Sequence, residues 1–172
     1  MKHQICSLGT GCFWCTEAIL SRVDGIAKVT AGYMGGHTDD PSYQDVCTGE
    51  TGHAEIVQIE FDPAKISFEQ ILEWFWVMHD PTQLNAQGAD VGTQYRTAIF
   101  YHDETQRETA ERSKRAADAS GRFSKPIVTE ITAASHFFAA EGYHQDYYRL
   151  NKNASYCRAV IAPKLEKLDL DS

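Results

Sequence analysis

Apolar and polar residues follow two different periods along this chain. Residues 54–61 alternate with a period of two, which is typical of a strand with one buried face. Residues 67–79 read as a helix that opens with Ser67 and Gln70 in capping-box spacing, and Asp103 with Gln106 caps a helix that runs to about residue 119. Together the patterns predict strands at residues 4–8, 26–33, 54–61, 93–101 and 127–132, and helices at 13–22, 67–79 and 103–119.

The order of the first six elements is β-α-β-β-α-β, the order of a ferredoxin-like plait. We therefore expect an α/β (α+β) fold with a plait core, a mixed sheet with helices on it, and a long irregular C-terminal segment with helical patches near residues 141–150 and 163–168. No repeat or linker interrupts residues 1–172, which predicts a single domain. Residues 34–52 and 81–92 read as loops, and a loop as long as the first one usually carries function.

Composition and charge exclude several classes of protein. Hydrophobic residues make up 42% of the chain and charged residues 23%, as in globular proteins. The net charge of −8 argues against nucleic-acid binding, which needs a basic surface. No apolar run approaches a membrane span or a signal peptide, so we expect a soluble, cytoplasmic protein that does not associate with membranes.

The chain contains five cysteines, an odd number, so at least one free thiol is expected. Cys12 follows a strand and a Gly-Thr-Gly turn and stands at the start of a predicted helix. The free N–H groups at a helix N-terminus stabilise a thiolate and lower its pKa. The alternative is a buried structural cysteine, since free cysteines are commonly buried.

Cys12 and Cys15 form a C-x-x-C motif, which suggests redox chemistry in an intracellular protein. A zinc site would need further soft ligands, for which Cys47 and His53 are candidates, but no second C-x-x-C exists. We therefore expect no metal and no cofactor. The two aromatic residues between the cysteines, at 13 and 14, are suited to form an apolar pocket beside the sulfur.

Glu55 is a candidate acid because of its position in the alternating segment. A period of two places it on the same face as Val57, Ile59 and Phe61. A carboxyl on that apolar face would be desolvated, so its pKa would rise and it would keep a proton to donate. The alternative is a frayed strand end with this carboxyl in water.

Three other residues have less specific signals. Tyr43 and Tyr95 are phenols near loop or strand ends, and Tyr95 shares a predicted strand face with Ile99. Core packing with a solvated hydroxyl is the simpler explanation for such a tyrosine. Asp90 precedes a predicted strand, where an Asp is most often a turn residue.

At these positions the sequence resembles the methionine sulfoxide reductase A family, over nearly the whole chain. The runs that carry the resemblance are Gly-Cys-Phe-Trp at 11–14, Pro-Ser-Tyr-Gln-Asp-Val-Cys at 41–47, Thr-Gly-His-Ala-Glu at 51–55, His-Asp-Pro-Thr at 79–82, Gly-Ala-Asp-Val-Gly-Thr-Gln-Tyr-Arg at 88–96, Ala-Glu at 140–141, Tyr-His-Gln at 143–145 and Tyr-Cys at 156–157. Several long motifs in the right order are far more specific than one C-x-x-C.

The resemblance implies an oxidoreductase that reduces the S epimer of methionine sulfoxide, free or in proteins, with electrons from thioredoxin. It implies that Cys12 is the nucleophile and that Glu55 protonates the sulfoxide oxygen. By the same resemblance Phe13 and Trp14 hold the substrate methyl group, and the sulfoxide oxygen is bound by Tyr43, Tyr95 and Asp90. Attack by the thiolate leaves a sulfenic acid, which condenses with a second thiol to a disulfide.

The chain departs from the family pattern around the second thiol. Position 15 is often Gly in the family, the usual Pro before Tyr156-Cys157 is missing, and no glycine-rich tail with a further cysteine follows. We favour Cys157 as the resolving thiol, with Cys15 as a rival or relay. Two other functions stay open: a thiol–disulfide oxidoreductase that uses Cys12 and Cys15, and a zinc-binding module.

Overall fold

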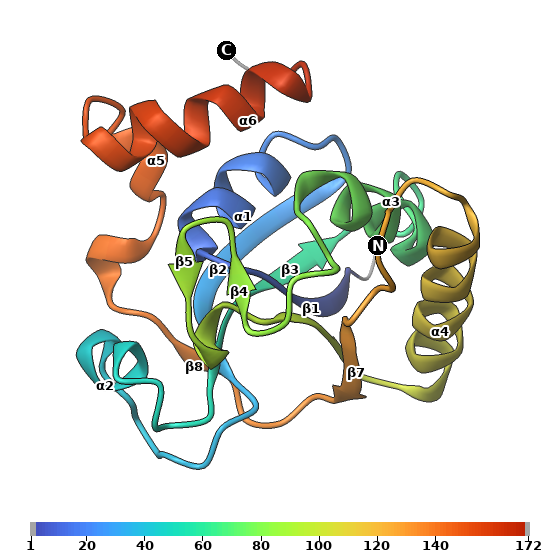
Figure 1. The fold of residues 1–172 in the computed structure, drawn as a ribbon, viewed down its shortest axis with the longest axis horizontal. Helices are drawn as coiled ribbons and strands as arrows, with labels where there is room; N and C mark the ends of the chain where they lie inside the picture. Colours follow the sequence, from blue (N-terminus) through green and yellow to red (C-terminus); the bar gives the residue numbers. More distant parts are fainter. Residues whose placement is uncertain (1–2, 171–172) are drawn as a thin grey trace.

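A six-stranded mixed sheet organises residues 3–170, which are the residues that the computed structural model describes (Figure 1). The strand order is β7-β6-β1-β3-β2-β8, and every neighbouring pair is antiparallel except β6 and β7, which are parallel. The strands are β1 (Gln4–Thr10), β2 (Ile26–Met34), β3 (Ala54–Phe61), β6 (Thr97–Tyr101), β7 (Glu130–Ala133) and β8 (Phe138–Ala139), and a separate hairpin is formed by β4 (Ala86–Gln87) and β5 (Asp90–Val91).

Two of the helices begin at the capping residues that the sequence predicts. The Ser67 hydroxyl accepts a hydrogen bond from the Gln70 N–H, and the Gln70 side-chain oxygen accepts one from the Ser67 N–H, which confirms the predicted capping box. The Asp103 side chain caps the helix that starts at Glu104. The helices are α1 (Phe13–Leu20), α2 (Tyr43–Cys47), α3 (Phe68–Met78), α4 (Glu104–Ala119), α5 (Tyr147–Leu150) and α6 (Ala162–Lys167), with a π-helical turn at Cys157–Ile161 before α6.

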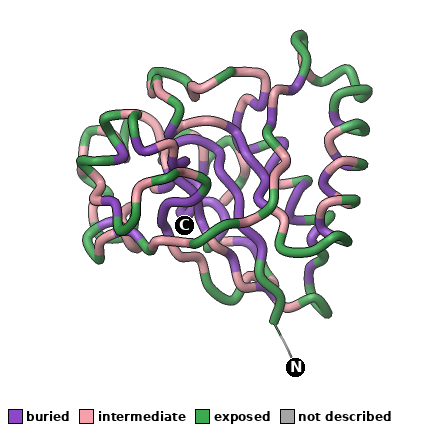
Figure 2. Tube along the Cα trace, turned by 90° about the horizontal axis from the view of Figure 1, so that it is seen from below, coloured by how far each residue is buried: buried purple, intermediate pink, exposed green. Residues whose placement is uncertain are grey.

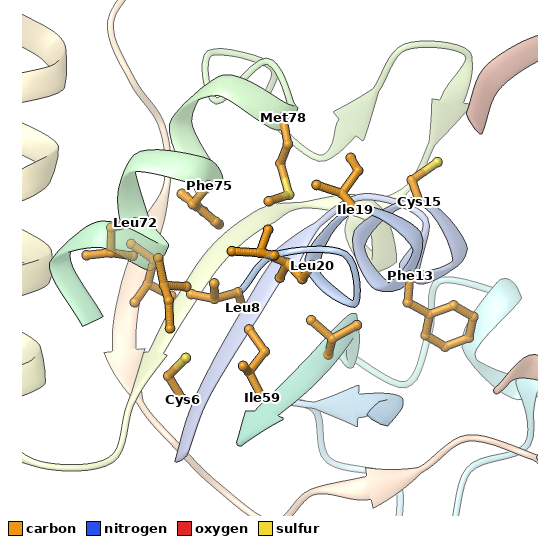
Figure 3. Packing of buried hydrophobic residues seen from close by; sticks show 14 of the residues in the cluster. Cys6, Leu8, Phe13, Cys15, Ile19, Leu20, Ile59, Leu72, Phe75 and Met78 are labelled. Atoms are coloured by element: carbon orange, nitrogen blue, oxygen red, sulfur yellow. The ribbon is translucent and has the colours of Figure 1, made fainter. Parts of the chain in front are cut away.

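The main core lies between one face of the sheet and the helices. Leu8 of β1 and Ile59 of β3 lie close to Leu20 of α1 and Phe75 of α3 (Figure 3), and all four are buried. Buried residues concentrate in the central strands, whereas α4 carries an exposed face (Figure 2). A smaller cluster on the opposite face includes Ile56. The main core therefore holds α1 against the sheet. The first residues of α1 lie next to the end of β1.

Four predicted segments differ from the structure. Residues 93–95 form a 3-10 turn and the strand starts only at Thr97, because the Tyr95 N–H bonds to the Gly92 carbonyl instead of to a neighbouring strand. The two predicted loops contain α2 and the β4–β5 hairpin. The C-terminal segment contains the two predicted helical patches as α5 and α6, and it is less irregular than predicted because a π-helical turn leads directly into α6. Among the helices of residues 3–170, none has the length and apolarity that crossing a bilayer requires.

Candidate active site

Cys12 stands where β1 passes into α1, and a glycine makes that turn possible. Gly11 has a φ of 108°, a conformation that L side chains rarely adopt. A Cβ at this position would also lie 2.8 Å from the Cβ of Gln87, so the glycine allows the β4–β5 hairpin to lie directly against the turn. Cys12 is the N-cap residue of α1 and remains partly exposed to solvent.

Glu55 lies on the same face of the sheet as the main core, as its strand phase predicts. Its side chain is 1% exposed, and Oε1 accepts a hydrogen bond of 3.2 Å from the Phe13 N–H. Oε2 has no hydrogen-bond partner among the residues that the structure describes. Burial raises the pKa of Glu55 to about 8, with smaller contributions from the charges of Asp90 and Cys15, while the Phe13 N–H acts in the opposite direction. The carboxyl therefore keeps its proton at neutral pH.

Aromatic rings gather beside Cys12 and Glu55. Phe13 lies 5.7 Å from the Tyr33 ring and 6.3 Å from the Tyr43 ring, measured between centroids. Trp14 donates its indole N–H to Nδ1 of His144 over 3.0 Å. Figure 3 shows Phe13 beside α1 among the buried residues, and its ring belongs to the main core cluster. These rings form the apolar surface that the two aromatics of the C-x-x-C predict.

Glu141 holds two of these tyrosines in place. One carboxylate oxygen accepts the Tyr33 hydroxyl over 3.0 Å, and the other accepts the Tyr43 backbone N–H over 3.0 Å. The second bond satisfies a free N–H in the first turn of α2. Glu141 thus connects the C-terminal segment to the loop between β2 and β3. Glu141 acts through contacts with residues that are distant in the chain. The only sequence signal for it is the Ala-Glu motif of the family resemblance.

The two predicted oxygen-binding phenols keep their protons. Burial, followed by the charge of Glu55, raises the pKa of Tyr43 and of Tyr95 well above the usual range. For Tyr95 the charges of Cys47, Asp90 and Cys12 add to the effect, which places its hydroxyl among the groups of the site. Tyr95 belongs to a 3-10 turn, so the prediction that it shares a strand face with Ile99 is wrong.

The pKa of Cys12 is raised, contrary to the prediction from its place at a helix N-terminus. A hydrogen bond with the Cys15 side chain is the largest cause, followed by burial and the charge of Glu55. The Trp14 N–H does lower the pKa, as helix geometry predicts, but the other effects outweigh it. At neutral pH the Cys12 thiol therefore keeps its proton.

Cys15 is the more acidic thiol of the pair. Its pKa is lowered to about 7, first by a hydrogen bond with Cys12 and then by the charge of Lys164 and a hydrogen bond with Tyr156, whereas burial and the charge of Asp90 act in the opposite direction. Its Sγ lies 3.7 Å from the Tyr156 hydroxyl, which donates to Oδ2 of Asp90 over 2.9 Å. Asp90 is therefore within reach of the thiol pair, although it lies in the short strand β5 and not in a plain turn.

A cavity of about 220 Å³ opens beside both sulfurs. Its wall includes Cys12, Cys15, Gln87, Asp90, Tyr156 and Lys164. Sequence reasoning assigned no role to Tyr156 or Lys164, because both come from the far C-terminal region and only tertiary contact brings them to the site. The Tyr-Cys motif at 156–157 was the only sequence signal for either residue.

The other candidate cysteines have different surroundings. Cys157 is 0% exposed and starts the π-helical turn, so it does not lie in the irregular part of the C-terminal segment. Its pKa is raised by burial and then by the charge of Cys15, which places it near Cys15. Cys47 is exposed at the end of α2. In residues 3–170 no three His, Cys, Asp or Glu side chains are grouped as a metal site.

Two adjacent thiols, a buried protonated carboxyl and an apolar aromatic surface define a thiol-dependent oxidoreductase on a mixed α/β fold. Residues 4–171 match the family model described as peptide methionine sulfoxide reductase. The peptide methionine sulfoxide reductase MsrA of Chromobacterium violaceum is 53% identical over 161 residues, which cover 94% of this chain and 92% of that protein. The MsrA of Natronomonas pharaonis is 51% identical, with 93% of this chain and 90% of that protein covered. The chain belongs to the peptide methionine sulfoxide reductase family and is an oxidoreductase that acts on methionine sulfoxide.

Solved structures show the same fold. The reduced form of Mxr1 from Saccharomyces cerevisiae has a TM-score of 0.85 and 34% identity, and the match covers 91% of this chain and 90% of that one. Mxr1 in complex with Trx2 has a TM-score of 0.61 and 22% identity, with 85% of each chain covered. These likenesses confirm the mixed α/β fold with helices on a mixed sheet.

Proposed function

We propose that this enzyme reduces the S epimer of methionine sulfoxide, free or in proteins, by attack of Cys12 on the sulfoxide sulfur. The observation that carries this proposal is the unpartnered, buried Oε2 of Glu55 beside the α1 N-terminus. A sulfoxide oxygen is a poor leaving group until it is protonated, so the thiolate needs an acid at this place. A carboxyl that stays protonated near pH 7 supplies that acid.

The thiol pair supplies the nucleophile. As Cys12 attacks the substrate sulfur, its proton moves to Cys15, the more acidic thiol of the pair. Glu55 protonates the sulfoxide oxygen as the bond between the two sulfurs forms. The hydroxyl group then moves from the substrate sulfur to the Cys12 sulfur, and the bond between the two sulfurs breaks together with the bond between that oxygen and the substrate sulfur. The products are methionine and a Cys12 sulfenic acid, so the substrate sulfur is reduced and the cysteine sulfur is oxidised by two electrons.

The remaining residues bind and orient the substrate. Phe13 and Trp14 hold the methyl group, since aromatic surfaces make favourable contacts with sulfur-bearing groups. Tyr43, Tyr95 and Asp90 bind the oxygen directly or through water. Support for the two phenols comes from their raised pKa values, which keep the hydroxyls as donors.

A second thiol, Cys15 or Cys157, then condenses with the sulfenic acid, and thioredoxin reduces the resulting disulfide. Thioredoxin is a dithiol of suitable potential for this exchange. The structure of yeast Mxr1 in complex with Trx2 supports a reductant of this kind. The lowered pKa of Cys15 also favours a second candidate, a thiol–disulfide oxidoreductase that reduces protein disulfides with the C-x-x-C.

The test is an assay on separated epimers of a methionine sulfoxide substrate with dithiothreitol as the reductant. We expect reduction of the S epimer, none of the R epimer, and loss of turnover in Cys12→Ser. The exposed Cys47 gives a matched control, because Cys47→Ser should keep full turnover. Turnover in Cys12→Ser, or reduction of insulin disulfides without any reduction of sulfoxide, would contradict the proposal.

We also propose that the four central strands form a ferredoxin-like plait. This interpretation is supported by the order β6-β1-β3-β2 and by antiparallel pairing throughout these four strands. Helix α1 connects β1 to β2, and α3 lies between β3 and β6 in the chain.

A further inference from the structure

A second cavity, of about 640 Å³, adjoins the cavity beside Cys12. Its wall comes from the end of α3, the connection between α4 and β7, and α6, which Figure 1 shows in the upper half of the view. Gln87 and Lys164 line both cavities. A third cavity, of about 500 Å³, shares Asp80 and Ser124 with the second. The three cavities therefore follow one another along the surface, starting at Cys12.

The second and third cavities together are called the basic groove, because cations dominate their walls. The chain as a whole has a net charge of −8, yet the only carboxylate that lines the groove within residues 3–170 is Asp80. His79 adds no charge, since burial lowers its pKa to about 3. The cations form no ion pair within residues 3–170. They are Arg122, Lys125, Lys164 and Lys167.

Arg122 is oriented for an incoming carboxylate. Its guanidinium lies 5.8 Å from the centre of the Phe123 ring, and Nε donates to the Ser120 hydroxyl over 3.3 Å. Its two terminal nitrogens have no hydrogen-bond partner within residues 3–170, so they can bind a carboxylate in the bidentate manner. Phe123 and Leu168 add apolar wall, and Val77 is 45% exposed at the same place. The groove thus suits a ligand with both acidic and apolar groups.

Gln87 fixes the boundary between the catalytic cavity and the basic groove. Its side-chain oxygen accepts the Asp80 N–H over 3.0 Å, and its side-chain nitrogen donates to the Asp80 carbonyl over 2.9 Å. Both polar groups of one peptide unit are therefore bonded to a single side chain, which holds the β4–β5 hairpin against the end of α3. Because this boundary is held in the unliganded chain, the passage between the two cavities is already formed.

We propose that the basic groove binds an acidic segment of an oxidised polypeptide while the methionine sulfoxide of the same polypeptide lies at Cys12. The inference rests on the proposed function, since it needs a sulfoxide at that cysteine. It makes polypeptides with Asp or Glu near the oxidised methionine the preferred substrates. An extended chain advances about 3.3–3.6 Å per residue, so a few residues pass from one cavity to the next. A small anion would occupy a single cavity and would gain nothing from their continuity.

The expected preference is moderate, because the groove cations Arg122, Lys125 and Lys167 are exposed. An exposed ion pair contributes about 1.5- to 5-fold in affinity. Two acidic residues that meet two of these cations should therefore raise kcat/KM about tenfold. The effect should also depend strongly on salt, since exposed charges are screened by ions in solution.

The first test compares blocked peptides that carry one S methionine sulfoxide and a pair of aspartates, serines or lysines at successive distances on either side. At low salt the best aspartate peptide should exceed the matching serine peptide about tenfold in kcat/KM, and the lysine peptide should fall below both. The advantage should vanish at about 1 M salt, where the Debye length is about 3 Å. Equal kcat/KM for aspartate and serine peptides at every spacing would overturn the inference.

The second test removes two exposed cations of the groove and leaves the catalytic cavity unchanged. Arg122→Met combined with Lys167→Met should lose most of the aspartate advantage. It should keep the kcat/KM of the serine peptide within about twofold, which also shows that the variant is folded. The matched control is Arg115→Met with Lys28→Met, because these exposed cations do not line the groove. An equal loss in both double variants, or no loss in the first, would contradict the inference.

A charge reversal sharpens the result. In Arg122→Glu the lysine peptides should gain in kcat/KM while the aspartate peptides lose, because the sign of the nearest charge is inverted. A loss for all peptides alike would show damage to the fold and not a change of preference, and it would count against the inference.

An aspartate peptide without a sulfoxide identifies any other occupant. We expect it to compete with the aspartate substrate and to leave the reduction of free methionine sulfoxide unchanged. If this peptide binds the groove while aspartate substrates have no advantage, the groove serves a separate partner and the inference fails. If neither free S methionine sulfoxide nor the serine peptide is reduced, the proposed function fails instead.

Discussion

Phe13 donates its backbone N–H to one oxygen of Glu55 over 3.2 Å and leaves the other oxygen buried without a partner. An unsatisfied buried acceptor is costly, and such costs persist mainly where function needs them. The contact also orients the carboxyl, because Phe13 belongs to the same turn of α1 as Cys12. The acid and the nucleophile are therefore held by the same few residues.

Glu55→Gln tests the acid directly. The amide cannot donate a proton to the sulfoxide, so we expect the single-turnover rate of methionine formation to fall by about 10²–10⁴. In the wild type this rate should also fall above pH 8, where Glu55 loses its proton, and the variant should lack this decline. Glu60→Gln on the same strand is the control. An unchanged rate in Glu55→Gln would exclude the acid role.

The raised pKa of Glu55 also predicts how stability depends on pH. The pKa is about 8 in the folded chain against a model value of 4.5, so protonation stabilises the folded state. This stabilisation is complete below about pH 4.5 and is lost as the pH rises through 8. Between these values the wild type should lose up to about 1.4 kcal/mol per pH unit relative to Glu55→Gln. Urea denaturation of both proteins at pH 5 to 9 measures the difference, and parallel curves would contradict it.

Gly11→Ala should damage both the fold and the site. The φ of 108° strains any L side chain, and the new Cβ would lie 2.8 Å from Gln87. We expect a loss of about 1–3 kcal/mol in the free energy of unfolding, together with lower activity because the hairpin that carries Asp90 must shift. Gly121→Ala is the matched control, since that glycine has a φ of 80° with nothing near its Cβ. Equal activity losses in the two variants would show that strain alone is responsible.

Glu141→Ala should weaken the site without removing any group proposed to touch the substrate. It breaks the hydrogen bonds to Tyr33 and Tyr43, and we expect a loss of about 1–3 kcal/mol in the free energy of unfolding. The KM for methionine sulfoxide should rise, because Tyr43 loses its anchor. Tyr143→Phe removes only the longer contact of 3.4 Å to the same carboxylate and should stay near wild type in both measurements.

Local patterns in the sequence determined the elements and several site residues. The alternation of residues 54–61 placed Glu55 on the apolar face, and the capping pair at Ser67 and Gln70 placed the start of α3, because both signals depend only on neighbours in the chain. The motifs around Cys12 were sufficient to indicate the family. Such signals cannot describe a contact between distant residues.

Tertiary structure alone decided the ionisation of the thiols and the partners of Cys15. The helix N-terminus favours an anion at Cys12, but the hydrogen bond with Cys15, burial and the charge of Glu55 raise its pKa instead. Tyr156 lies 141 residues after Cys15 in the chain. Its hydroxyl comes close to the Cys15 sulfur only because the C-terminal helices pack on α1. A pKa depends on every charge and every layer of protein around a group, so it is a property of the folded chain.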